Sequence, residues 1–267
     1  MNKITNDYLT ESNQRLLEQL KDSNEGERCF ILGNGPSLKH MNLERLLGEH
    51  IFCVNWFCLH QLYSRFEKIN YVICDPHFWN YGDGFHEELI HEIVKNKNIQ
   101  LFLDSSAAQH VRVNNSLESH PKNLSKNSIF LAFNKEMKLW EDSPFHVDFS
   151  KPLSWGYTVV IDFCLPLAFH MGFKEVYLLG CDCDYKLKVD KDFKDSFFYD
   201  IDRIPESDKR HLRFQRDNKG SQEKNHCWEP SYQKAKDYFE LNGRKIFNAG
   251  IGGKLEVFNR IEYESLF

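Results

Sequence analysis

The sequence lacks the features that mark exported, membrane-spanning and disulfide-rich proteins. Its first residues, MNKITNDYLTESNQR, are polar and contain no apolar signal-peptide core. No apolar run approaches the roughly eighteen residues that a transmembrane helix needs. The eight cysteines include no CxxC pair and mostly lie within apolar runs, which predicts reduced thiols. These absences predict a cytoplasmic protein without a transmembrane segment, at most peripheral to the inner membrane.

The sequence also lacks internal repeats, low-complexity segments and any excess of positive charge. The chain of 267 residues has a formal charge of −5, which argues against a nucleic-acid-binding face. Its hydrophobic fraction of 41% and charged fraction of 27% are those of a globular protein. This length suits one α/β domain with an insertion. Aromatic residues, at 14%, are the one excess.

Short apolar runs alternate with stretches of helical periodicity, which predicts an α/β fold with a Rossmann-like, mostly parallel sheet flanked by helices. The predicted strands are Arg28–Gly33, Ile51–Asn55, Tyr71–Asp75, Gln100–Asp104, Glu175–Asp182 and Lys245–Asn248. The predicted helices are Leu59–Phe66, Glu87–Lys95, Tyr157–Met171, with a kink at Pro166, and Ser231–Leu241, followed by a C-terminal Gly243.

The chain divides into an N-terminal extension and one nucleotide-binding domain. Residues 1–25 are polar and amphipathic and predict an appended helix, whereas residues 26–267 contain all the predicted strands. Within that domain, residues 185–225 are rich in Lys, Asp, Phe and Arg and show no clean period. Because this stretch is too long for an ordinary connection, we expect a lid over the carboxyl edge of the sheet.

A glycine-rich turn, GNGPSL, directly follows the first predicted strand and contains Asn34, Gly35 and Ser37. Glycines at such a turn let backbone N–H groups approach a phosphate, and a helix N-terminus favours negative charge. The third glycine of GxGxxG and the lysine of GxxxxGK[ST] are both missing. On this pattern alone, the segment is compatible with a ligand-binding loop and with a tight structural turn.

Polar residues end the next two predicted strands. Asn55 ends FCVN and Asp75 ends YVICD. Residues at the carboxyl ends of parallel strands face the place where open α/β sheets bind ligands. Either residue alone is more often a turn former or cap. Together with the GNG turn, they favour a nucleotide site.

A second cluster begins at Ser154-Trp155-Gly156, where Ser154 and Gly156 offer donors at a predicted helix N-terminus. The strand VYLLG that follows ends at Asp182 and Asp184, which are able to chelate Mg²⁺ or to cap a turn. Cys181 and Cys183 with His226-Cys227 fit no common zinc module.

One histidine and two tyrosines complete the candidate residues. His226 lies at the far end of the predicted lid, and imidazole is the side chain best suited to accept a proton near neutral pH. Tyr185 and Tyr199 belong to the same region. By contrast, His86 and His91 resemble a zincin motif but are five residues apart, about 140° around a helix, so they cannot share a metal.

Three segments carry a resemblance to a known family: GERCFILGNGPSLKHMNLERL, HMGFKEVYLLGCD and GRKIFNAGIGGKLEVFNRIEYESLF. They resemble the bacterial MptE-like family, domain of unknown function 115, whose members often accompany surface-polysaccharide genes. The match runs from about Gly26 to Phe267. The same landmarks are similar to the Campylobacter-type sialyltransferases of glycosyltransferase family 42.

The sialyltransferase resemblance implies a CMP-activated nonulosonic acid donor, a glycan acceptor and no metal or other cofactor. It implies that His226 deprotonates the acceptor hydroxyl and that Tyr185 and Tyr199 hydrogen-bond the leaving phosphate. The residues implied or predicted to hold the nucleotide sugar are Asn34, Gly35, Ser37, Asn55, Asp75, Ser154, Gly156 and Asp182.

The leading hypothesis is therefore a glycosyltransferase of bacterial surface-glycan (lipopolysaccharide or capsule) synthesis that uses a CMP-linked sugar. One alternative is the activity that names the MptE family, transfer of diphosphate from ATP to a hydroxymethylpterin with Mg²⁺. In that reading Asp75, Asp182 and Asp184 are metal ligands. A second alternative is a non-catalytic nucleotide-binding factor. The sequence leaves a homo-oligomer open.

Overall fold

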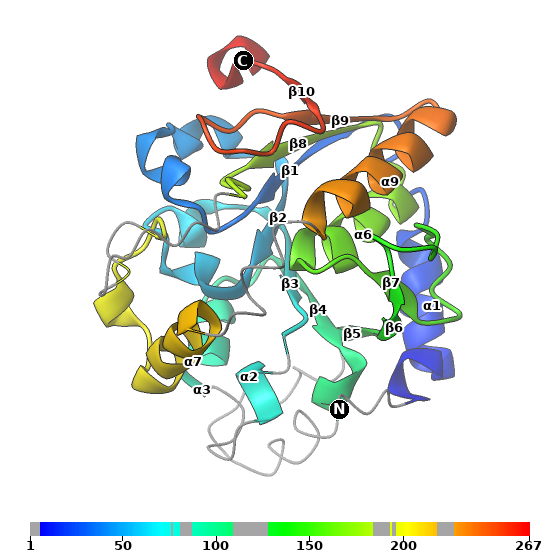
Figure 1. Ribbon diagram of the computed structural model, residues 1–267, viewed down its shortest axis with the longest axis horizontal. Helices are drawn as coiled ribbons and strands as arrows, with labels where there is room; N and C mark the ends of the chain where they lie inside the picture. The colour runs from blue at the N-terminus through cyan, green and yellow to red at the C-terminus, as the bar shows by residue number, and fades with distance from the viewer. Residues whose placement is uncertain are drawn as a thin grey trace.

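An eight-stranded parallel sheet forms the centre of the protein (Figure 1). The computed structural model describes residues 6–75, 77–80, 87–108, 128–183, 193, 196–217 and 227–267. The strand order is β10-β9-β8-β1-β2-β3-β4-β5, and neighbouring strands are parallel. The strands are β1 (Arg28–Leu32), β2 (His50–Val54), β3 (Lys68–Ile73), β4 (Ile99–Asp104), β5 (Ser128–Leu131), β8 (Glu175–Leu179), β9 (Lys245–Asn248) and β10 (Asn259–Arg260). This arrangement confirms the predicted fold class.

Both faces of the sheet are buried, which explains why its strands are continuous apolar runs. In β1, Phe30 and Leu32 pack into one hydrophobic core, while Cys29 and Ile31 pack into the core on the opposite face. All eight cysteines have free thiols.

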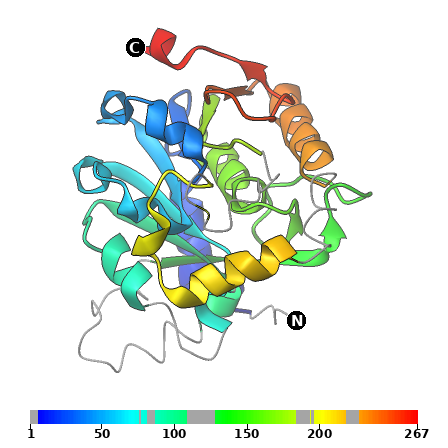
Figure 2. The ribbon, with the colours of Figure 1, turned by 60° about the vertical axis from the view of Figure 1, so that its left-hand side comes forward.

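Two sets of elements cover the two faces (Figures 1 and 2). One face carries α1 (Glu11–Leu20), α6 (Leu165–His170), α9 (Trp228–Leu241) and a small sheet of β6 (Phe133–Lys138) and β7 (Leu153–Trp155). The other carries α2 (His77–Asn80), α3 (Glu87–Ile93), α7 (Glu206–Asp217) and the 3₁₀ turns between β1 and β3. None of the helices in these described ranges combines the length and apolar character that crossing a bilayer requires.

The N-terminal helix α1 caps the open edge of the sheet at β5. The side chain of Asn13 is 2% exposed. Its Nδ2 donates to the carbonyl of Phe130 at 2.9 Å, and its Oδ1 accepts the Phe130 N–H at 2.7 Å. One amide thus pairs with the edge strand as a neighbouring strand would.

The prediction of a helix at Leu59–Phe66 is wrong. Two short 3₁₀ turns, Asn55–Leu59 and Tyr63–Arg65, stand there instead. His60 between them is extended, with φ −69° and ψ 136°, and its Nδ1 accepts the Leu62 N–H at 3.2 Å. A side chain that bonds the local backbone in this way competes with helix formation.

The predicted helix Tyr157–Met171 is divided. A π-helical turn, Val160–Cys164, precedes α6. Pro166 has no N–H to continue the α-helical ladder, which accounts for the interruption that the sequence predicts. The helix predicted at Ser231–Leu241 begins earlier, at Trp228, and Gly243 follows it with a positive φ of 70°. The short strands β5, β6, β7 and β10 and the helix α7 were not predicted.

Candidate functional site

The two glycines of the GNG turn are explained by a close approach of two loops. A Cβ on Gly33 would lie 2.3 Å from the carbonyl oxygen of Gly180, and one on Gly35 would lie 2.4 Å from Oδ2 of Asp182. The N–H of Gly33 donates to Leu179 O at 2.8 Å, and that of Gly35 donates to Gly180 O at 2.9 Å. Both N–H groups therefore bind protein carbonyls, and the turn packs against the loop after β8.

Two of the predicted nucleotide-binding residues, Ser37 and Asp182, bind each other. The Asp182 carboxylate accepts the Ser37 N–H at 3.1 Å and the Ser37 hydroxyl at 2.5 Å. It thereby caps the 3₁₀ turn Pro36–His40, whose first N–H groups favour a negative charge.

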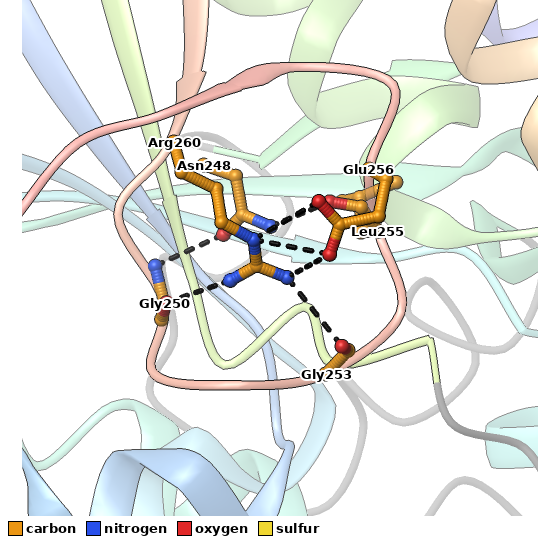
Figure 3. A network of polar contacts seen from close by, with 6 residues as sticks. All are labelled: Asn248, Gly250, Gly253, Leu255, Glu256 and Arg260. Carbon is orange, nitrogen blue, oxygen red and sulfur yellow. Dashed lines mark hydrogen bonds and ion pairs between the residues drawn. The ribbon is translucent and has the colours of Figure 1, made fainter.

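The C-terminal loop, which belongs to the third segment of the family resemblance, completes this region. Figure 3 shows the polar contacts within that loop. Lys254 N–H donates to Asp182 O at 2.7 Å, and a Cβ on Gly253 would lie 2.7 Å from the same oxygen. The guanidinium of Arg260 holds the loop by donating to Gly250 O, Gly253 O and the Glu256 carboxylate.

Two buried amide oxygens at the carboxyl ends of β1 and β2, those of Asn34 and Asn55, have no hydrogen-bond partner among the described residues. Asn34 Nδ2 donates to Val54 O at 3.2 Å, so this side chain spans from β1 to β2. Asn55 has a left-handed backbone with φ 49°, and its carbonyl accepts the Tyr71 hydroxyl at 2.5 Å. A buried acceptor without a donor costs about 1–3 kcal/mol, a cost that a hydrogen-bond donor from a ligand would remove.

Residues 197–199 pack beside these strand ends. Phe198 N–H donates to Asn34 O at 3.2 Å, and its ring packs 5.4 Å from that of Phe57. Tyr199 is only 6% exposed and stacks on Phe197 at 5.0 Å. Burial raises the pKa of Tyr199 well above its ordinary value, so its phenol stays protonated and remains a donor.

A cluster of two histidines and two aspartates lies after β3, where the sequence had predicted only Asp75. The Asp75 carboxylate accepts the His77 N–H at 3.0 Å and lies 3.9 Å from His211 Nε2. His77 Nε2 bonds Asp208, with both side chains buried, and the rings of His77 and His211 stack with centroids 4.0 Å apart. These contacts join α7 to α2 and to the residue after β3.

The predicted donors at the second cluster are used within the protein. Ser154 Oγ donates to Pro144 O at 2.8 Å, and Gly156 N–H donates to Asp162 Oδ1 at 2.5 Å. Asp162 is buried, and desolvation raises its pKa well above the ordinary value. A Cβ on Gly156 would lie 2.3 Å from Ile161 Cγ2, which explains the glycine.

A further acidic residue, Asp104, ends β4 and was missed as a site residue, although it follows the same strand-end rule as Asn55. Its side chain accepts the N–H of Ser106 at 3.0 Å and also the Ser106 hydroxyl. Burial raises its pKa to about 6, against the hydrogen bonds from Ser106, which lower it. Polar residues thus follow the carboxyl ends of β1, β2, β3 and β4.

Three of the predicted site residues, Tyr185, His226 and the potential metal ligand Asp184, lie outside the described residues. Within the described ranges, no group of three or more His, Cys, Asp or Glu side chains is arranged to hold a metal ion. Asp75 and Asp182 are not brought together there, since Asp182 bonds Ser37 and Asp75 faces His77 and His211.

These features define an α/β protein with a doubly covered parallel sheet and a polar carboxyl edge, beside which residues 197–199 and α7 lie. Among solved structures, the chain matches the sialyltransferase CstII from Campylobacter jejuni, in complex with "a substrate analogue, cytidine-5'-monophosphate". The match has 18% sequence identity, covers 88% of each chain and has a TM-score of 0.35, which is too low to support an argument. No family model and no curated protein matches the chain. The motif resemblance to the MptE-like family therefore stays a prediction.

Proposed function

We propose that the protein is a glycosyltransferase of bacterial surface-glycan synthesis that transfers a sialic-acid-like nonulosonic acid from a CMP-sugar to a glycan hydroxyl. The observation that supports this proposal best is the pair of unpartnered oxygens of Asn34 and Asn55 at adjacent strand ends. Ribose hydroxyls and the amino group of cytosine can donate hydrogen bonds to such oxygens. The sequence motifs around these two asparagines are those that resemble the sialyltransferases.

The transfer would proceed by displacement at the anomeric carbon of the donor. The acceptor oxygen forms a bond to that carbon, the bond from the carbon to the CMP phosphate oxygen breaks, and CMP leaves with the electron pair. His226 takes the proton from the acceptor hydroxyl, a contribution of about 10²–10⁴-fold for a positioned base. Tyr185 and Tyr199 would donate hydrogen bonds to the leaving phosphate as its charge develops.

The contacts of the acidic residues do not favour the pterin diphosphokinase alternative. Asp182 uses both carboxylate oxygens on Ser37, and Asp75 uses one on the His77 N–H. Carboxylates engaged in this way are less suited to bind Mg²⁺ between them and a triphosphate. The nucleotide test below still distinguishes the two activities.

Thermal unfolding of the full chain with CMP, CDP, UDP and ATP, each with and without Mg²⁺, tests which nucleotide the protein binds. We expect CMP to raise Tm without metal, because a ligand that binds only the folded state stabilises it. Asn34→Ala should weaken CMP binding about tenfold, the order expected for one lost hydrogen bond. Asn242→Ala, an exposed change after α9, is the matched control and should leave CMP binding unchanged.

Release of CMP from a CMP-sugar in the presence of acceptor tests the reaction. His226→Ala should lose transfer and keep CMP binding. A rise in Tm only with ATP and Mg²⁺ would refute the proposal in favour of the diphosphokinase. CMP binding without transfer to any surface-glycan acceptor would instead indicate the non-catalytic factor.

A further inference from the structure

Two of the five tryptophans are not fully buried, and one of these, Trp155, packs against the margin of a hydrophobic core. Trp56, Trp79 and Trp228 are at most 7% exposed, whereas Trp140 and Trp155 are only half-buried and lie together. The ring centroids of Trp140 and Trp155 are 5.0 Å apart, and Tyr157 stacks on Trp155 at 4.7 Å. We refer to Trp140, Trp155 and Tyr157 as the aromatic platform.

The platform is held in place by contacts from three elements. Leu139 N–H donates to Trp155 O at 2.9 Å, which joins the turn after β6 to the end of β7. Lys234 of α9 donates to Ser143 O at 2.9 Å and so fixes the loop that follows Trp140. These contacts arrange the rings before any ligand binds, which reduces the entropy cost of recognition.

Backbone strain at Tyr157 also points to a function. Tyr157 has a φ of 84°, a backbone conformation that residues other than glycine rarely adopt. Hydrogen bonds from the N–H groups of Gly156 and Tyr157 to the buried Asp162 carboxyl accompany this turn. Strained residues of this kind concentrate at ligand sites, where the surrounding structure maintains them.

Positive charge accompanies the platform. Lys135 is exposed, and its ammonium lies 5.7 Å from the ring centroid of Trp155 and 5.9 Å from that of Phe133. Lys138 lies 6.0 Å from the ring centroid of Trp140 and pairs with Glu141 at 2.9 Å. Lys135 also lowers the pKa of the buried Asp104, against the larger effect of burial, so its charge is felt at the carboxyl edge of the sheet.

We propose that the aromatic platform and Lys135 form the acceptor subsite and bind an acidic pyranose, a sugar ring that carries a carboxylate. The C–H face of a pyranose packs on an aromatic ring, while an ammonium beside the ring attracts the carboxylate. This inference rests on the proposed glycosyltransferase function. The platform lies near the start of α9, because Cys227 is close enough to raise the pKa of Tyr157 beyond the rise caused by burial.

Intrinsic tryptophan fluorescence provides a direct test on the full chain. The matched probes are methyl glucuronide and methyl glucoside, which differ only in the carboxylate. We expect saturable quenching by the glucuronide, with a Kd about tenfold lower than for the glucoside. Lys135→Gln should remove this preference, whereas Lys151→Gln, at an exposed site paired with Asp148, should retain it. Equal binding of both sugars, or binding of neither, would overturn the assignment.

Transfer kinetics separate this inference from the proposed function. Trp140→Ala should raise KM for an acidic acceptor about tenfold and leave CMP affinity unchanged, and Trp140→Phe should recover most of the loss. A wild-type acceptor KM in a folded Trp140→Ala variant would refute the platform while the transferase proposal stands. Conversely, saturable glucuronide binding by a chain that binds no CMP would refute the transferase proposal and with it the acceptor role, and would leave the platform as a binding site for acidic sugars.

Discussion

The buried carboxyl group of Asp104 makes a pH-dependent contribution to the free energy of unfolding. The side chain is 4% exposed at the end of β4, and burial raises its pKa from 3.8 to about 6. A rise of this size in the pKa means that folding disfavours the ionised form over the protonated form by about 3 kcal/mol. Because the folded pKa is raised, this stability is fully present below pH 3.8 and is lost as the pH rises through about 6.

The substitution Asp104→Asn removes the need to ionise a buried group. An amide keeps an oxygen that can accept from Ser106, so the neutral contacts survive. At pH 8 we expect the variant to be more stable than the wild type by about 1–3 kcal/mol, the upper value being reached if no hydrogen bond is weakened. At pH 4 the difference should nearly vanish, because the wild-type carboxyl is protonated in the folded protein.

Urea denaturation at a series of pH values from 4 to 8 measures this difference. Comparing variant and wild type at each pH cancels the other titrating groups to first order. Asp142→Asn, at an exposed position, controls for the loss of one negative charge. A difference between Asp104→Asn and wild type that does not change with pH, or that falls as the pH rises, would refute the argument.

Three further changes test the strand ends. Asn55→Gly removes both the left-handed strain and the unpartnered oxygen, so it should stabilise the unliganded protein by about 1 kcal/mol in urea denaturation while weakening CMP binding; lower stability would contradict this. Gly33→Ala places a Cβ against Gly180 O and should cost about 1–3 kcal/mol in the same assay; unchanged stability would mean that the two loops separate easily. Asp208→Ala removes the buried hydrogen-bond partner of His77 Nε2 and should cost about 1–3 kcal/mol, with faster amide hydrogen exchange in α7; unchanged exchange there would show that α7 is held by other contacts.

The strands of the central sheet were predictable where both faces are buried. CFIL and VYLL are continuous apolar runs because each of their side chains enters one of the two cores. The strands β6 and β7 were not predictable in this way, since FNKEMK alternates poorly and pairs with LSW, which is distant in sequence. In α7, ESDKRHLRFQRD is mostly charged; Leu212 packs against a core but Phe214 is 65% exposed, so no apolar period marks the helix.

The candidate site was predictable only in part, because several of its contacts join residues that are far apart in the sequence. The rule that polar residues follow parallel strands pointed to Asn55 and Asp75, and applied to β4 it would also have found Asp104. The bond between His77 and Asp208 joins residues 131 positions apart, and no local pattern announces it. The glycines of the GNG turn were recognised, but the carbonyl of Gly180 that requires Gly33 belongs to a distant loop.

The amide of Asn13 has a consequence for how copies of this chain behave toward each other. Phe130 lies on the last strand of the sheet, and an uncovered last strand recruits strands from other molecules. A chain that lacked α1 would present the N–H and carbonyl of Phe130 to such partners. The N-terminal helix therefore protects the protein against self-association, and its removal is expected to produce aggregation before it disturbs the strand ends at Asn34 and Asn55.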